Sequence, residues 1–191
     1  MERNIAQIAL FAAMIAALGL VPQITLGFGV PITAQTLGVM LAGAVLGARR
    51  GAAAAGLFLL LVALGLPLLA GGRGGLGAFA APTAGFALGF PVAAFATGFF
   101  VDHVRLRSAG LAAGLGAVFG GIAILYICGA TGLSIVSGKS LAEAFTLIAV
   151  FIPGDLLKAA ITGMLVQALA KVRPQTLAWH RDSASVTQTR L

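Results

Sequence analysis

The sequence predicts an all-α membrane protein with six transmembrane helices. Hydrophobic residues make up 60% of the 191 residues and charged residues only 9%, whereas a soluble domain carries roughly 25% charged residues. Six apolar runs approach the roughly 20 residues that a helix needs to cross a bilayer. Most Lys and Arg residues lie in the short connections between these runs, which is typical of a protein whose surface faces lipid.

Prolines and tight turns separate the six predicted spans. Pro22 ends the first span, a very short turn at Ala48–Gly51 joins the second and third into a hairpin, and Pro67 stops the third. Pro153 predicts a kink or a break near Ile152 in the last span. The predicted spans are Ile5–Leu20, Ile32–Gly47, Ala52–Leu66, Thr83–Val101, Ala109–Gly129 and Ala144–Ala170.

Three stretches outside the spans have distinctive compositions. Leu69–Pro82 contains too many glycines for a stable regular helix, yet it is too apolar for an open aqueous loop. Thr131–Glu143 is predicted to be a polar connection between the fifth and sixth spans. Residues 173–191 are predicted to form a polar cytoplasmic tail, in which Trp179 lies either at the membrane interface or in solvent.

The basic residues predict the orientation of the spans. An even number of spans places both termini on one side, and nine of the twelve Lys and Arg residues fall on that side. Arg73 and Lys139 fall on the other side, and Lys158 lies within the sixth span. The positive-inside rule therefore places both termini in the cytoplasm. The nine are Arg3, Arg49, Arg50, Arg105, Arg107, Lys171, Arg173, Arg181 and Arg190.

Several function classes are disfavoured by composition and motifs. The net charge of +7 does not form a basic stripe, so no nucleic-acid partner is predicted, and the bases are interpreted as topology signals and contacts to membrane lipid. The single Cys128 excludes a disulfide within the chain. The sequence shows no metal-binding cluster and no Ser/His/Asp or Cys/His set. An enzyme is therefore not predicted. No ATP-binding motif occurs, so energy for any transport must come from a gradient or another subunit.

Asp155 and Lys158 are charged residues within an apolar span. Their spacing of three places them on one face of a helix. An unpaired ion at membrane depth costs several kcal/mol, so both should face the bundle interior or a cavity. One interpretation is a structural ion pair. The interpretation that we favour is a ligand site, because a helix broken at Pro153–Gly154 exposes backbone polar groups beside the pair.

Arg73 lies between two Gly-Gly pairs on the outer side. The glycines allow close approach to a solute, and the guanidinium fork suits a carboxylate. The alternative to a ligand contact is a flexible loop whose arginine lies at the level of the lipid headgroups. Together with the Asp155–Lys158 pair it predicts a site for a small anionic solute. Gln35 and Thr83 are equally well explained as helix caps or as ligand contacts. The expected apolar lining is Phe28, Phe79, Phe86 and Tyr126.

Ala9, Ala13 and Ala17 form a stripe of small residues on the first span. Such a face allows another helix to pack closely. Packing within this bundle is the simpler explanation from the pattern alone, because alanine is frequent throughout the chain.

The chain resembles BioY, the family of biotin-specific substrate-binding (S) components of energy-coupling factor (ECF) transporters. The resemblance covers about Ile5 to Val172. Its most specific parts are VPITAQTLGVMLAGAVLGARRG at Val30–Gly51, GLPLLAGGRGGLGAFAAPTAGFALGF at Gly65–Phe90 and PGDLLKA at Pro153–Ala159. Ala84 stands where the family more often has glycine.

The resemblance implies a six-helix S-component bundle over residues 1–172 with an outward-facing biotin pocket. It implies high-affinity biotin uptake across the cytoplasmic membrane, with a transmembrane coupling protein and two ABC ATPases as partners. Biotin is then the transported substrate, and no cofactor is implied. The family's polar pocket residues correspond to Arg73, Asp155 and Lys158. Its coupling-protein contact corresponds to Ala9, Ala13 and Ala17.

The chemistry of biotin suggests a specific placement. Asp155 is expected to accept from the ureido N–H groups, Lys158 to donate to the ureido oxygen and Arg73 to bind the carboxylate, although the two cations can exchange roles. A self-sufficient, gradient-driven carrier of a small anionic vitamin is the first alternative, with Asp155 as a proton site. A non-transporting membrane scaffold is the second.

Overall fold

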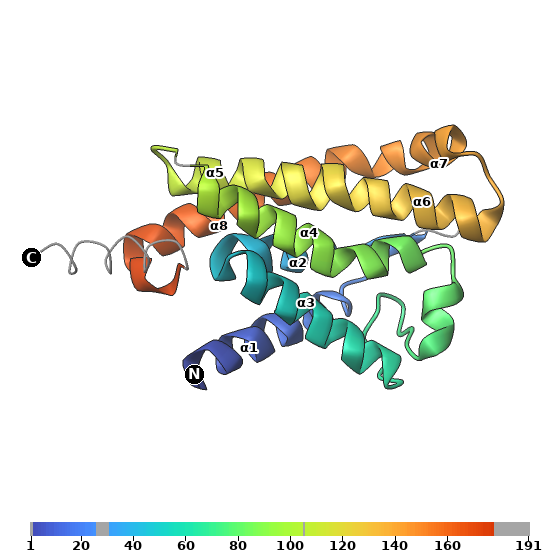
Figure 1. The fold of residues 1–191 in the computed structure, drawn as a ribbon, viewed down its shortest axis with the longest axis horizontal. Coiled ribbons are helices and arrows are strands. Elements are labelled where there is room, and N and C mark those ends of the chain that lie inside the picture. The colour runs from blue at the N-terminus through green and yellow to red at the C-terminus, as the bar shows by residue number, and fades with distance from the viewer. Residues whose placement is uncertain (1, 26–30, 105, 178–191) are drawn as a thin grey trace, which may run out of the picture.

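The computed structural model describes residues 2–25, 31–104 and 106–177, which form a bundle of helices (Figure 1). Within these residues, three helical segments are long and apolar enough to cross a membrane: Ala84–His103, Ala109–Ser137 and Leu141–Val172. Three shorter helices, α1 (Glu2–Leu18), α2 (Gln35–Leu46) and α3 (Ala48–Ala63), lie in the first three predicted apolar runs.

The three long segments differ in regularity. The first is the single helix α4, Ala84–His103. The second joins α5 (Ala109–Ala117), a π-helical stretch (Val118–Ile124) and α6 (Leu125–Ser137) without interruption. The third consists of α7 (Leu141–Ile148), a 3-10 turn (Ala149–Phe151) and α8 (Ile152–Val172). The break predicted near Ile152 is therefore confirmed, with Pro153 in the first turn of α8, where proline fits a helix.

Two predicted connections are wrong. Thr131–Ser137 continues α6, and the Thr131 hydroxyl donates to Ile127 O of its own helix at 2.8 Å, so a polar side chain is accommodated without ending the helix. The helix ends at Gly138, whose φ of 66° is left-handed. The turn between α2 and α3 is shorter than predicted, since Gly47 alone separates them and Ala48–Gly51 forms the first turn of α3.

The remaining connections contain little regular structure. Two short strands, β1 (Ile24–Thr25) and β2 (Pro31–Ile32), pair antiparallel. Leu69–Pro82 forms an isolated bridge between Leu69 and Arg73 and a 3-10 helix at Leu76–Ala80. As predicted, the glycine-rich stretch contains no α-helix.

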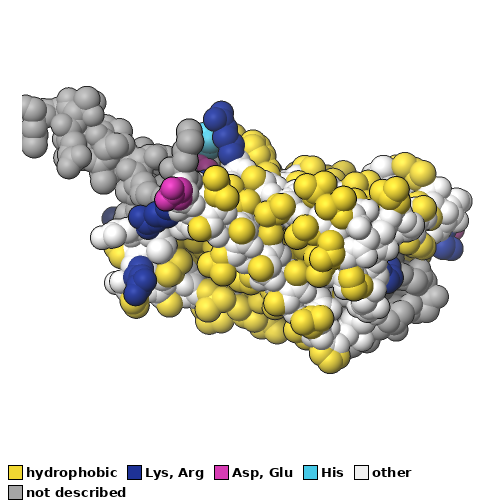
Figure 2. All heavy atoms as spheres, turned by 90° about the horizontal axis from the view of Figure 1, so that it is seen from below, with side chains coloured by type: hydrophobic (Ala, Val, Ile, Leu, Met, Phe, Trp, Pro, Cys, Tyr) yellow, Lys and Arg dark blue, Asp and Glu magenta, His cyan; other side chains and the backbone are white. Residues whose placement is uncertain are grey.

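Helix α4 lies at the centre of the bundle and contacts α2, α3, α5 and α6 (Figure 1). Glycines permit the closest approaches. A Cβ on Gly85 would lie 2.8 Å from the Cα of Gly132 on α6, so neither position has room for a side chain. On the face shown in Figure 2, apolar side chains cover the middle of the molecule and charged side chains lie toward its ends.

The two ends of the described chain lie at the same end of the bundle (Figure 1). Arg3 Nη2 donates to Gln175 O at 3.5 Å. A 3-10 turn, η4 (Pro174–Thr176), follows α8, and the next residue, Leu177, is fully buried. The packed part of the chain therefore reaches residue 177, while Trp179 and the rest of the predicted tail lie outside the described residues.

Candidate functional site

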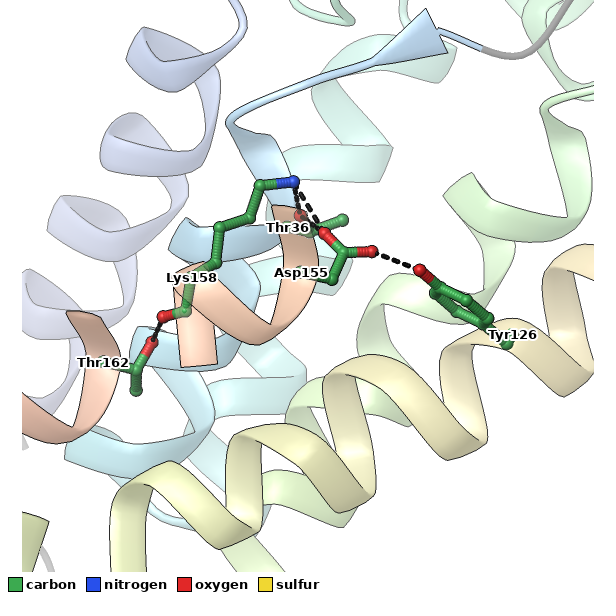
Figure 3. A network of polar contacts seen from close by, with 5 residues as sticks. All are labelled: Thr36, Tyr126, Asp155, Lys158 and Thr162. Carbon is green, nitrogen blue, oxygen red and sulfur yellow. Dashed lines mark hydrogen bonds and ion pairs between the residues drawn. The ribbon is translucent and has the colours of Figure 1, made fainter. Parts of the chain in front are cut away.

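Asp155 is the centre of a polar network that joins three helices (Figure 3). Its side chain is buried, and Oδ1 forms an ion pair with Lys158 Nζ at 2.6 Å. The Thr36 hydroxyl on α2 accepts from Lys158 Nζ at 2.9 Å and donates to Oδ1 at 3.3 Å. Tyr126 OH on α6 donates to Oδ2 at 2.7 Å. Both carboxylate oxygens are thus held in place by side chains.

The start of α8 determines where this pair lies. The 3-10 turn before Ile152 ends the preceding helix, and Asp155 follows within the first turn of α8. A carboxylate near a helix N-terminus is stabilised by the helix dipole. Lys158 follows one turn later on the same face, as the spacing of three predicted. Both side chains point into the bundle, toward α2 and α6 (Figure 3).

Arg73 is held by the loop that carries it. Its Nε donates to Ala70 O at 3.2 Å, and its Nη1 donates to the Thr83 hydroxyl at 3.0 Å. Gly71 and Gly72 have φ values of 79° and 70°, which residues with side chains rarely adopt. The glycines therefore allow the tight return that brings Arg73 back against Leu69.

Gln35 binds three backbone groups from two other segments. Its Nε2 donates to Ile15 O on α1 at 3.2 Å and to Leu68 O at 3.0 Å. Its Oε1 accepts from Ala70 N at 2.9 Å. The side chain is 2% exposed. Gln35 thereby ties the end of α1 to the loop that carries Arg73, a positioning role that neither sequence interpretation included.

Thr83 occupies the N-cap position of α4 but makes no side-chain capping bond. Its hydroxyl instead accepts a hydrogen bond from Arg73, the residue that is predicted to bind the carboxylate of the solute. Of the two interpretations that the sequence left open, the structure does not show the capping role.

One cavity lies between these residues. All five predicted ligand residues, Arg73, Asp155, Lys158, Gln35 and Thr83, line it together. Its apolar wall includes Phe86, as expected, and also Phe90 and Phe151, which sequence reasoning did not single out. Tyr126 is not in the lining but contacts Asp155, Phe79 is likewise not in it, and Phe28 lies outside the described residues. The remaining lining residues are Thr33, Thr36, Leu69, Ala70, Ala87 and Leu125.

The free space in this cavity is about 60 Å³. Pockets for drug-sized ligands usually enclose at least roughly 300 Å³. Asp155 and Lys158 sit on a regular helix, whereas Arg73 belongs to a loop anchored by a few hydrogen bonds. A ligand of that size does not fit into the cavity in this conformation.

The alanine stripe of α1 faces outward. Ala9, Ala13 and Ala17 are exposed, whereas Ala12 and Ile15 on the opposite face are buried in the bundle. Packing within the bundle therefore does not account for this stripe in the structure. An exposed surface of small residues remains available to another helix.

Comparisons with known proteins agree on one family. The family model described as "BioY family" matches residues 2–175. The biotin transporter BioY of Rhodobacter capsulatus is 54% identical, over 93% of this chain and 98% of its own length. That of Rhizobium etli is 52% identical, over 87% of this chain and 92% of its own. A crystal structure of the S-component for biotin from an ECF-type ABC transporter superposes with a TM-score of 0.82 at 33% identity, covering 88% of this chain and 91% of that one.

Proposed function

This chain belongs to the BioY family, and we propose that it captures biotin outside the cell and delivers it across the cytoplasmic membrane as the S component of an ECF-type transporter. The observation that carries the proposal is the convergence of a buried Asp–Lys pair and an arginine on one cavity. That charge set suits a ligand with adjacent N–H and C=O groups at one end and a carboxylate at the other.

The unused hydrogen-bonding capacity of the pair matches a ureido group. Lys158 has three donors and uses two, on Asp155 and Thr36. The Asp155 carboxylate has about four acceptor positions and receives three bonds, from Lys158, Thr36 and Tyr126. One donor remains on Lys158 Nζ, and one acceptor position remains on Asp155 Oδ2. They suit the carbonyl and one N–H of the ureido ring, and the second N–H requires a rearranged bond.

Arg73 supports the carboxylate end of the placement. It uses two of its five N–H donors, on Ala70 and Thr83. The other three are available to the valerate carboxylate. Because Arg73 belongs to the loop side of the cavity, we propose that this glycine-rich loop and the first loop open for biotin and close over it.

The membrane arrangement is part of the proposal. All six apolar helical segments cross the bilayer, and both termini are cytoplasmic, because nine of twelve bases then lie inside. The exposed face of Ala9, Ala13 and Ala17 contacts the transmembrane coupling protein. Two ABC ATPases complete the module, and their ATP hydrolysis reorients the loaded chain. The proposal includes no cofactor, and it assigns biotin binding to residues 1–172.

Reconstitution tests this function. Proteoliposomes containing the chain alone should bind labelled biotin without ATP-dependent accumulation, and those with a complete ECF module should accumulate it when ATP is enclosed. Asp155→Asn in the complete module should strongly reduce accumulation at limiting biotin concentrations. Accumulation by the chain alone that an uncoupler abolishes would instead establish a gradient-driven carrier. Absence of any biotin binding would establish a scaffold.

A further inference from the structure

A groove on the outer surface of the bundle runs between α5 and α8, away from the biotin cavity. It encloses about 690 Å³. It is lined by small residues and by large apolar residues that are exposed. The small residues are Gly110, Gly114, Ala159, Ala160, Gly163 and Ala168, and the exposed large residues are Leu111, Leu115, Leu156 and Met164.

The length of this groove matches one leaflet of a membrane. Along α5 it extends from Ser108 to Val118, and ten residues of helix span about 15 Å. The hydrocarbon core of a bilayer is about 30 Å thick, so one leaflet contributes about 15 Å. Ser108 Oγ donates to Gln167 Oε1 at 2.9 Å, and Lys171 follows Gln167 one turn later in α8, so Ser108 and Lys171 lie at the same end of the groove. The positive-inside distribution places this end at the cytoplasmic surface.

The charge of the groove favours an anionic occupant. Among the described residues that line it, Lys171 is the only charged one, and it lies at the cytoplasmic end. Cations at this level attract anionic lipid headgroups. The polar end of the groove thus matches the headgroup of a phospholipid, and the apolar remainder matches an acyl chain.

Gly114 lines the groove at a position where contact between α5 and α8 does not require a glycine. A Cβ on Gly110 would lie 2.8 Å from Gly163 O, and one on Gly163 would lie 2.7 Å from Gly110 O, so helix contact explains both. A Cβ on Gly114 would lie 3.6 Å from Ala159 O, an ordinary contact distance. Glycine inside a helix is less favourable than alanine. Helix packing therefore does not require glycine at position 114, and a large side chain there would fill part of the groove.

We infer that the α5–α8 groove binds one anionic phospholipid of the cytoplasmic leaflet, with an acyl chain over Gly114 and the headgroup phosphate at Lys171. This inference rests on the membrane orientation proposed above and not on the identity of the transported ligand. A neutral phospholipid shares the acyl contacts but lacks the net negative charge.

Native mass spectrometry of the purified full chain tests the site. The probes are phosphatidylglycerol and phosphatidylcholine with identical acyl chains. The wild type should retain one phosphatidylglycerol and bind phosphatidylcholine about fivefold more weakly, as expected from one lysine at a membrane surface. Lys171→Gln should remove that preference, and Gly114→Leu should remove retention of both lipids.

Matched variants and biotin titrations serve as controls. Lys139→Gln removes a cation from the opposite side, and Gly56→Leu fills a position with no atom within 4 Å of an added Cβ; both should retain phosphatidylglycerol. Biotin affinity measured on each sample reports folding and tests the proposed function separately. Equal retention of the two lipids, or wild-type retention by Gly114→Leu, would overturn the inference. So would a dimer that Gly114→Leu dissociates, since the groove would then hold a second copy.

Discussion

Replacing Asp155 by Asn preserves the shape of the side chain and removes its charge. The structure predicts a large loss of biotin affinity, because the carboxylate presents the acceptor that the ureido N–H needs. A hydrogen bond to a charged group contributes about 1.5–3 kcal/mol. Since 1.4 kcal/mol corresponds to tenfold in affinity, the dissociation constant should rise about 10- to 150-fold. The assay is isothermal titration of the detergent-solubilised chain with biotin.

Glu143→Gln is the matched control for this substitution. Glu143 is an exposed carboxylate that caps α7 through Ser140, and it is not in the cavity lining. Its replacement should leave biotin affinity unchanged. Thermal unfolding of both variants verifies that they are folded. An Asp155→Asn protein that is folded and binds biotin within twofold of the wild type would refute the reasoning.

The double variant Asp155→Asn/Lys158→Gln separates a ligand site from a structural ion pair. Removing one partner of a buried pair leaves an uncompensated charge and costs about 3–5 kcal/mol. Neutralising both partners removes that cost, so the double variant should be more thermostable than Asp155→Asn. Its biotin affinity should remain as low, because both ureido contacts are absent. Recovery of affinity together with stability would show that the pair is only structural.

Three further predictions concern the loop and the first helix. Arg73→Lys keeps the charge but loses the planar fork, so biotin affinity should fall at least about tenfold. Affinity for biotinamide, which lacks the carboxylate, should change little. Equal losses of affinity for both ligands would contradict the carboxylate assignment. Gln35→Met leaves three backbone groups without their hydrogen-bond partner, and each unsatisfied buried group costs about 1–3 kcal/mol of stability. The melting temperature and the biotin affinity should therefore both fall. An unchanged melting temperature would argue against the positioning role. Ala13→Trp should leave biotin binding by the isolated chain intact but impair ECF-dependent uptake. The same change at Ala123, another exposed alanine, should not impair that uptake. Equal uptake by both variants would place the coupling interface elsewhere.

Much of the fold could be predicted because lipid imposes strong constraints on sequence. Apolar runs and Pro153 located the helical segments and the break before α8. The helix ends were harder to predict. The sequence predicts a loop from Thr131, but the hydroxyl of this residue bonds to the backbone one turn earlier, an arrangement that hydropathy does not distinguish from a solvated loop.

The charged part of the site was predictable for a similar reason. Asp155 and Lys158 are conspicuous in an apolar span, and Arg73 is conspicuous among glycines. The bonds of Gln35 were not predictable, because its partners at positions 15, 68 and 70 are far away in sequence. The role of Tyr126 was only partly accessible. A phenol in an apolar helix needs a hydrogen-bond partner, but its contact with Asp155 depends on where the bundle places α6 relative to α8.

Equilibrium titration of the purified chain with biotin and desthiobiotin tests the central claim most directly. Desthiobiotin retains the ureido ring and the carboxylate but lacks the sulfur, so it keeps every group assigned here to Asp155, Lys158 and Arg73. We expect saturable binding of one biotin per chain, and competition by desthiobiotin for the same site. Absence of saturable biotin binding by folded protein would contradict it.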